Sequence, residues 1–192
     1  MHYGGNKSEY VNNVIRVRPA DDIPGWLGIS PRALNGFDFR FENNTVEVLP
    51  GSPTSKQHAF SLYLSTVADT AASDGVFIIR NNTFIGGENS YPGVNVVFAT
   101  NAIPTFTFII DGNTFQSTAA SPDKLLVLES IGNTFHGLLG KTIIRHNVFK
   151  NGYVSLSPVF QDLVFDGNSI DAGTTVDHCL YIHDGWSAGA YP

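Results

Sequence analysis

The fold of this chain is decided by a segment that reads Phe77-Ile-Ile-Arg-Asn-Asn82-Thr-Phe84, because four other segments repeat its pattern. In each copy an apolar run ends in a bend residue, an Asn, a β-branched or small polar residue, and a second apolar residue. The other copies are residues 39–46, 108–115, 142–149 and 163–170, and residues 131–135 repeat only the second half. Self-similar segments 20–50 residues apart are typical of solenoids.

The columns of this repeat predict a strand followed by a tight bend. Three and five positions before the Asn, most residues are aromatic or aliphatic, and a spacing of two points both columns to one face of a strand. The apolar column resumes two positions after the Asn, so the chain re-enters the core beyond the bend. The bend position holds residue types that readily enter the left-handed backbone region: Asn43, Asn81, Gly112, His146 and Gly167.

The Asn column selects the architecture. One Asn in a bend is an ordinary turn residue, but the same Asn in five equivalent bends is best explained if the bends stack and each amide bonds the next. The spacings between successive Asn residues are 38, 31, 34 and 21, so the loops vary while the strand-and-bend unit stays fixed. We therefore predict a structural ladder of Asn44, Asn82, Asn113, Asn147 and Asn168.

Further strand candidates between the repeats predict two or more strands per coil. They are residues 59–64, 94–98, 125–128, 153–156 and 179–182. Residues 56–72 also fit a helical stripe, and we favour the strand. The simplest division is one all-β domain over residues 1–192, with 1–36 as an irregular entry or cap and 185–192 as a C-terminal tail.

These repeats resemble those of the right-handed parallel β-helix proteins, the pectate-lyase-like superfamily, in which an aliphatic strand precedes Asn-Asn-Thr-Phe or Gly-Asn-Thr-Phe. Residues 37–184 carry the resemblance. It implies a right-handed parallel β-helix, here of about five or six coils, which we expect to be part of a longer β-helix. Because the superfamily includes lyases, hydrolases, epimerases, tailspikes and adhesins, the resemblance implies a polysaccharide partner and an extracellular or virion-surface location without choosing an activity.

Two positions before the Asn, acidic and basic side chains alternate. With strands about 4.8 Å apart, each carboxylate would lie next to a guanidinium. The simpler interpretation is an external salt-bridge ladder. The alternative is a polysaccharide groove with catalytic residues Asp111, Asp166 and Arg145, since glycosidases need two carboxyls about 5–9.5 Å apart. The column reads Glu42, Arg80, Asp111, Arg145 and Asp166.

The column four positions before the Asn should face outward, yet four of its five members are aliphatic. A strand that is apolar on both faces is covered on both faces. We expect this stripe to be at least half buried in the native assembly, under the chain's own loops or a second subunit. Resemblance to tailspike-like proteins makes a homotrimer the leading form of the second option. After Arg40, the stripe consists of Ile78, Ile109, Ile143 and Val164.

The remaining candidate site residues lie outside these columns. Alternation around residues 179–182 places Asp177, Tyr181 and His183 on one face and His178 on the other. A His–Tyr–carboxylate set suits proton transfer at a sugar carbon, which makes His183 a further catalytic candidate, although an ordinary polar strand fits the same pattern. The candidates for substrate binding are Arg80, Tyr91, Glu129, Tyr181 and Trp186.

Composition narrows the range of partners. The 192 residues carry a formal charge of −6 and no Lys/Arg-rich segment, which argues against nucleic acid. No apolar stretch is long enough to span a membrane. No cofactor is predicted, because metal-binding His motifs and Cys pairs are absent from the sequence. Asp21, Asp22 and residues 69–74 offer carboxylates for calcium, but too sparsely for an obvious cage.

Two functions remain open at this point. The first is recognition of an extended polysaccharide along the β-helix, with cleavage or epimerisation by a lyase, hydrolase or epimerase activity as options. The second is a non-catalytic stalk or fibre segment, of a phage tail or an adhesin, that associates with its own copies. The aliphatic stripe favours the stalk, whereas Tyr91 and Trp186 favour sugar binding.

Overall fold

In the computed structural model of the chain, every regular element described is a β-strand. The 18 strands form three sheets of six, and each neighbouring pair runs parallel. The predicted all-β parallel fold is confirmed. The structure describes residues 7–17, 27–29, 37–49, 58–65, 75–86, 91–99, 107–120, 123–130, 139–156, 160–173 and 178–182.

Each sheet takes every third strand of the chain. The first sheet contains β1 (Lys7–Val11), β4 (Phe37–Glu42), β7 (Gly75–Arg80), β10 (Thr107–Asp111), β13 (Leu139–Arg145) and β16 (Phe160–Asp166). The second contains β2 (Val14–Val17), β5 (Thr45–Val48), β8 (Thr83–Gly86), β11 (Thr114–Ser117), β14 (Val148–Lys150) and β17 (Ser169–Asp171). The third contains β3 (Leu27–Ile29), β6 (His58–Ser65), β9 (Tyr91–Ala99), β12 (Asp123–Ser130), β15 (Gly152–Leu156) and β18 (Leu180–Ile182).

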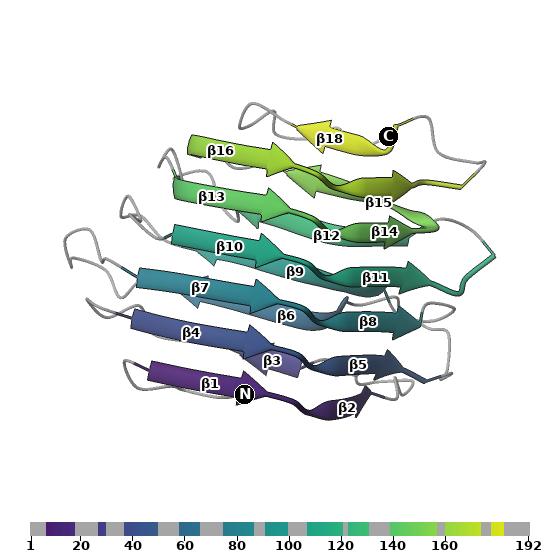
Figure 1. Cartoon of the computed structure of the whole chain (residues 1–192), viewed down its shortest axis with the longest axis horizontal. Helices are drawn as coiled ribbons and strands as arrows, with labels where there is room; N and C mark the ends of the chain where they lie inside the picture. Colours follow the sequence, from purple (N-terminus) through teal and green to yellow (C-terminus); the bar gives the residue numbers. More distant parts are fainter. Residues whose placement is uncertain are drawn as a thin grey trace.

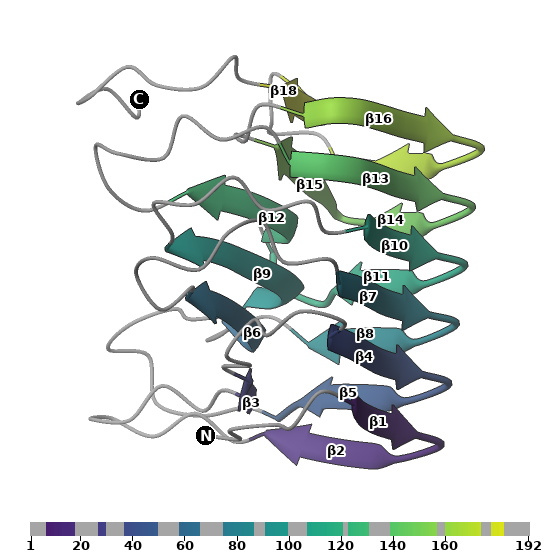
Figure 2. The same cartoon turned by 90° about the vertical axis from the view of Figure 1, so that its left-hand side faces the viewer.

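The chain passes through the three sheets in turn and then rises by one strand. In Figure 1 the first-sheet strands run from left to right on the near side while the stack rises from β1 to β16, so the winding is right-handed. Figure 2 shows the same coils one above another from the side. Six strands per sheet correspond to six coils, within the predicted five or six.

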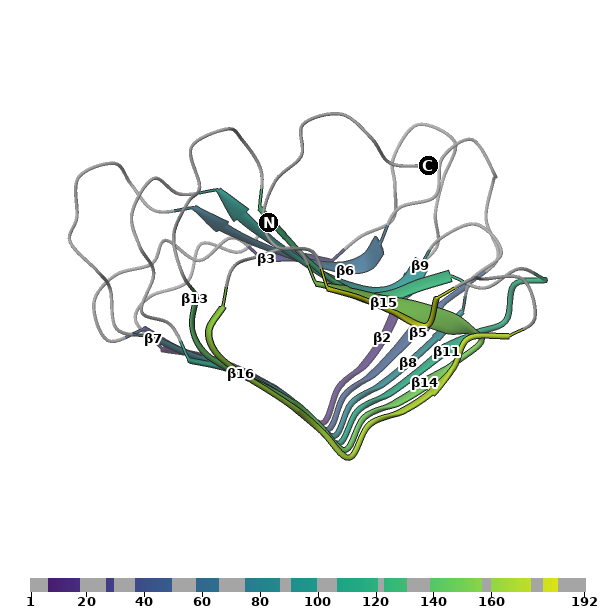
Figure 3. The same ribbon diagram turned by 90° about the horizontal axis from the view of Figure 1, so that it is seen from above.

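The core lies between the three sheets. Seen along the coil axis, the first and second sheets meet at a sharp corner and the third lies opposite (Figure 3). In the second sheet, Phe84, Phe115 and Phe149 stack with neighbouring ring centroids 4.9 Å apart, and in the first sheet Phe77 stacks on Phe108 at 4.8 Å. All five rings are fully buried. Because burial of each such ring contributes about 1.5–3 kcal/mol, the stacks hold successive coils in register.

Left-handed residues form the corner between the first and second sheets, as predicted. At Gly112, a Cβ would come within 2.6 Å of Asn81 Oδ1, so a larger residue would need the exposed Asn81 side chain to move. The backbone angle φ lies between 53° and 66° at all five predicted positions: Asn43, Asn81, Gly112, His146 and Gly167.

In every coil but the last, the Asn after the left-handed corner residue is hydrogen-bonded to the next coil. The backbone N–H and the Nδ2 group of Asn113 both donate to Asn147 Oδ1 at 2.9 Å, and Nδ2 also donates to the Ile79 carbonyl. Asn113 Oδ1 accepts the equivalent pair of bonds from Asn82, so the amide uses all its hydrogen-bonding positions. The same bonds confirm the whole predicted ladder: Asn44, Asn82, Asn113, Asn147 and Asn168.

The ladder starts one coil earlier than predicted. Asn13 donates from its backbone N–H and Nδ2 to Asn44 Oδ1, at 2.8 and 2.9 Å. Residues 1–36 contain β1, β2 and β3, so the prediction of an irregular entry is wrong for 7–17 and 27–29. The sequence did not reveal this first copy of the repeat, because Ser8 occupies the core position that an aromatic residue takes in the next two coils.

The additional strand candidates correspond to the third sheet. Strands β6, β9, β12, β15 and β18 overlap the five predicted segments, and the strand interpretation of residues 56–72 is confirmed over β6. Two other predictions, the partial repeat at 131–135 and the tail at 185–192, lie outside the described residues.

Candidate functional site

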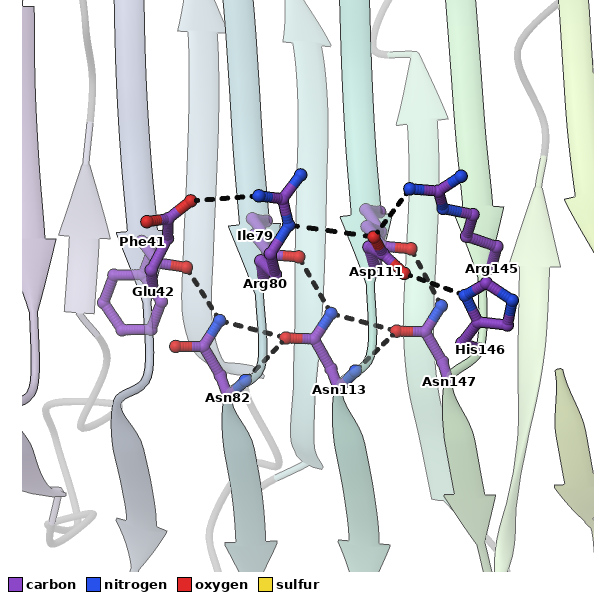
Figure 4. Close-up of polar contacts among 11 residues, drawn as sticks. Phe41, Glu42, Ile79, Arg80, Asn82, Asp111, Asn113, Arg145, His146 and Asn147 are labelled. Atoms are coloured by element: carbon purple, nitrogen blue, oxygen red, sulfur yellow. Dashed lines mark hydrogen bonds and ion pairs between the residues drawn. The ribbon is translucent and has the colours of Figure 1, made fainter. Parts of the chain in front are cut away.

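The alternating charges lie at the ends of the first-sheet strands, on the outside of the corner. We name Glu42, Arg80, Asp111, Arg145 and Asp166 the charge ladder. The strand register places each of them beside the next. Figure 4 shows the central members in a row beside the Asn ladder, on the strand side of the bend.

Ion pairs join four of the five members. Arg80 Nη1 lies 3.8 Å from Glu42 Oε1, and Arg80 Nε lies 3.7 Å from Asp111 Oδ2. Arg145 Nη2 donates a shorter hydrogen bond of 3.0 Å to the same Oδ2. Among the described residues, Arg145 has no ion pair with Asp166. The salt-bridge interpretation is therefore confirmed from Glu42 to Arg145.

Asp111 is the centre of this network. Its side chain is 14% exposed, and its Oδ1 lies 3.2 Å from His146 Nδ1. Burial by itself raises the pKa of Asp111, but hydrogen bonds from Arg145 and His146, together with the charges of Arg145 and Arg80, outweigh burial and lower it. His146, which sequence analysis assigned only to the bend, is thus also a member of the charged cluster.

The lowered pKa of Asp111 makes this carboxyl unsuitable as a proton donor. A carboxyl with a lowered pKa is ionised at neutral pH, whereas a general acid must carry its proton. Asp111 and Asp166 lie two strands apart, which is roughly 9–10 Å at the usual strand spacing, and the strand carrying Arg145 lies between theirs. Asp111 therefore suits charge balance better than the role of a general acid, and the catalytic role of Asp166 stays a prediction.

The aliphatic stripe is already covered to a large extent in the single chain. Ile78 is 6% exposed, and Ile109, Ile143 and Val164 are half-buried. They are successive partners in the strand register, so each residue shields the flanks of its neighbours. The predicted burial is met without a second subunit, and the homotrimer remains a prediction.

An aromatic cluster lies on the outer face of the third sheet. The rings of Tyr153 and Tyr181 meet edge to face with centroids 5.7 Å apart, and His178 lies 5.1 Å from Tyr181. Val154, the neighbour of Tyr153 in β15, points into the core, so Tyr153 faces outward. The prediction that His178 lies on the opposite face from Tyr181 is wrong, because β18 begins only at Leu180 and the alternation does not extend to His178.

Tyr153 is a candidate that sequence analysis missed as a site residue. The segment 153–156 was recognised only as a strand. Its closeness to Tyr181 depends on the register that pairs Ser155 with Tyr181. The irregular spacing between the last two coils hides that register in the sequence.

Four predicted site residues lie wholly or partly outside the described part of the chain. His183 and Trp186 lie outside the described residues. Tyr91 and Glu129 lie in β9 and β12, where Glu129 pairs with Val97 in register, but their side chains are outside the description.

No metal site is evident in the part of the chain that the structure covers. Within it, no three His, Cys, Asp or Glu side chains come together as ion ligands would. The calcium candidates Asp21, Asp22 and residues 69–74 lie outside the described residues. The same ranges contain no helix that is long and apolar enough to cross a membrane.

Comparison with known proteins adds nothing to this geometry. No protein-family model, curated protein or solved structure matches the chain.

Proposed function

We propose that this chain is a pectate-lyase-like β-helix that binds an extended polysaccharide on its outer surface. The observation that supports this proposal is the cluster of Tyr153, Tyr181 and His178 outside the third sheet. A sugar ring has an apolar C–H face and a polar hydroxyl rim. Tyrosine offers the matching combination of an apolar ring and a polar tip.

The repeating form of the surface fits a polymer. Neighbouring strands of one sheet lie about 4.8 Å apart, so a glycan that runs parallel to the coil axis meets one coil after another. Lys124, which pairs with Tyr153 in register, extends the polar part of the cluster to the preceding coil. Because the charge ladder is largely neutralised by its own ion pairs, we expect a neutral or weakly charged polymer.

Binding without cleavage is the form of this function that the charge ladder favours. Asp111 has a lowered pKa and hydrogen-bonds Arg145. Its exchange for Asn should therefore leave glycan binding at the aromatic cluster unchanged. Polymer cleavage that disappears in Asp111→Asn or Asp166→Asn, with folding retained, would contradict this part of the proposal.

Calorimetric titration with neutral and acidic oligosaccharides tests the binding surface. Tyr153→Ala and Tyr181→Ala should each weaken binding about 3- to 10-fold, because each removes one aromatic contact. Gln116→Ala, a half-buried outward position on the second sheet, is the matched control and should bind like the wild type. Equal binding by both Tyr variants and the wild type, or no binding by the wild type, would rule the proposal out.

A structural stalk is the second candidate. It is favoured by the Asn ladder, which joins all six coils without a break and would stiffen the solenoid. In this role, the aliphatic stripe would mediate a homotrimer. Light scattering should then give three times the chain mass, falling to one chain mass in an Ile109→Lys, Ile143→Lys double variant. A wild-type monomer would remove the trimer from consideration.

A further inference from the structure

The outer face of the first sheet carries the aliphatic stripe and has no partner among the described strands. In Figure 3 this sheet forms one side of the coil, with the core on its inner side and no described strand beyond its outer side. Ile109, Ile143 and Val164 keep part of their side chains exposed on that face. Because a sheet that is apolar on both faces is normally covered on both faces, the single chain leaves the stripe incompletely covered.

The charge ladder runs beside the stripe, and its own contacts do not satisfy it. Asp166 is exposed and has no ion pair within the described ranges. Arg80 lies 3.8 Å from the Glu42 carboxylate and 3.7 Å from that of Asp111, and both distances are too long for a hydrogen bond. In the described part of the chain, the Nε groups of Arg80 and Arg145 have no hydrogen-bond partner. The ladder therefore keeps charge and donor groups that a second surface can use.

The ladder is complementary to itself when its order is reversed. Over β7, β10, β13 and β16 it alternates base and acid, as Arg80, Asp111, Arg145 and Asp166. A two-fold axis that lies parallel to the strands, between β10 and β13, brings the outer faces of two copies together with the coils in opposite order. Arg80 of one copy then faces Asp166 of the other, and Asp111 faces Arg145. Every charge in these four coils meets its opposite.

The same axis places the aliphatic stripe on itself. Ile78 of one copy faces Val164 of the other, and Ile109 faces Ile143, so apolar side chains meet only apolar ones across sheets about 10 Å apart. A three-fold axis along the coils would instead bring identical coils together. Arg80 would then meet Arg80, and Asp111 would meet Asp111, which places like charges side by side. The charge pattern therefore favours a two-fold pair over a homotrimer on this face.

We propose that two copies of this chain form a dimer through the outer faces of their first sheets, with their coil axes antiparallel. The interface is isologous, so each contact between the copies occurs twice. The stripe forms its apolar centre, and the Arg80–Asp166 and Asp111–Arg145 pairs lie along one side. The aromatic cluster of Tyr153 and Tyr181 lies on the third sheet and stays outside the interface. The dimer is therefore independent of glycan binding.

Sedimentation over a range of concentrations tests the dimer. The wild type should show a monomer–dimer equilibrium, and Asp166→Arg, which puts two like charges opposite each other at both ends of the contact, should weaken it about tenfold or more. Asp171→Arg is the matched control. It makes the same charge change at an exposed carboxylate of the second sheet, beside Lys150 as Asp166 is beside Arg145, and should dimerise like the wild type. Circular dichroism should show wild-type strand content in both variants. A wild type that is monomeric at every concentration, or equal dimerisation by the two variants, would overturn the proposal.

Cysteine cross-linking tests the antiparallel arrangement. In the proposed dimer, Val76 faces Asp162 of the second copy across about 10 Å, whereas the two Val76 residues are also three coils apart, about 14 Å along the axis. The background variant is Cys179→Ser, because Cys179 is exposed. A thiol reagent about 10 Å long should join Val76→Cys chains to Asp162→Cys chains when they are mixed, and should join neither to itself. Val76→Cys chains that cross-link to one another, as a three-fold assembly requires, or a mixture that gives no cross-link, would overturn the proposal.

Discussion

The corner between the first and second sheets carries two ladders that are held together differently. Inside it, the Asn113 side chain is fully buried and bonded to both neighbouring coils at 2.9–3.0 Å. Outside it, the contacts of Asp111 range from 3.0 to 3.7 Å, and the Arg145 side chain is 43% exposed. Neutral amides satisfy one another at little desolvation cost, whereas water competes for the charged groups. The inner ladder therefore sets the coil geometry, and the outer ladder balances charge on a shape already fixed.

The largest effect is expected from removing an inner rung. Asn113→Ala leaves the Asn82 backbone N–H and the Asn82 Nδ2 group without the oxygen to which both donate. Each orphaned buried group costs about 1–3 kcal/mol, so the free energy of unfolding should fall by about 2–6 kcal/mol. Urea unfolding followed by circular dichroism measures the change.

The matched control is the same substitution at the end of the ladder. Asn168 is only half-buried, so water can reach the groups that Asn168→Ala exposes. Its cost should be clearly smaller than that of Asn113→Ala. An equal loss of stability in the two variants would show that middle and end rungs of the Asn ladder contribute alike.

An intermediate effect is expected at the centre of the outer ladder. Asp111→Asn removes the carboxylate shared by Arg80, Arg145 and His146, and should cost about 1–3 kcal/mol at neutral pH. The pKa of Asp111 is lower in the folded chain than in the unfolded one, where it is about 3.9. Its contribution is therefore present above that value and is lost as pH falls through the folded pKa.

Measuring both proteins against pH separates this charge effect from simple packing. The stability difference between wild type and Asp111→Asn should shrink below about pH 5 and disappear in stronger acid. Asp171→Asn, at an exposed position at the end of the stack, serves as the control and should show little difference at any pH. A constant difference for Asp111→Asn would mean that the carboxylate charge does not stabilise the fold.

The contrast between the ladders also explains what the sequence could predict. Asn82, Asn113 and Asn147 recur at a fixed place in each repeat, because stacking requires the same residue in every coil. The alternation of Arg80, Asp111 and Arg145 was visible because it occupies another fixed position of the same repeat. Tyr153 and Tyr181 come together only through the register of β15 and β18, and the sequence spacing between these strands does not follow the repeat, so no periodic pattern could reveal the cluster. The first coil was missed because Ser8 replaces the aromatic residue that marks the next copies.

The smallest effect is expected at an external ion pair that is short but open to water. Arg16 Nε lies 2.8 Å from Glu47 Oε2, a shorter distance than in either ion pair of Arg80 described above, yet the two side chains are 64% and 41% exposed. Arg16→Gln should lower the free energy of unfolding by no more than about 0.2–1 kcal/mol, and high salt should remove the difference. Urea unfolding at low and high salt measures this loss of stability. A loss as large as that of Asp111→Asn would show that burial does not decide how much an external ion pair contributes. Because the expected loss of stability is small, Arg16→Gln should leave the whole coil stack folded.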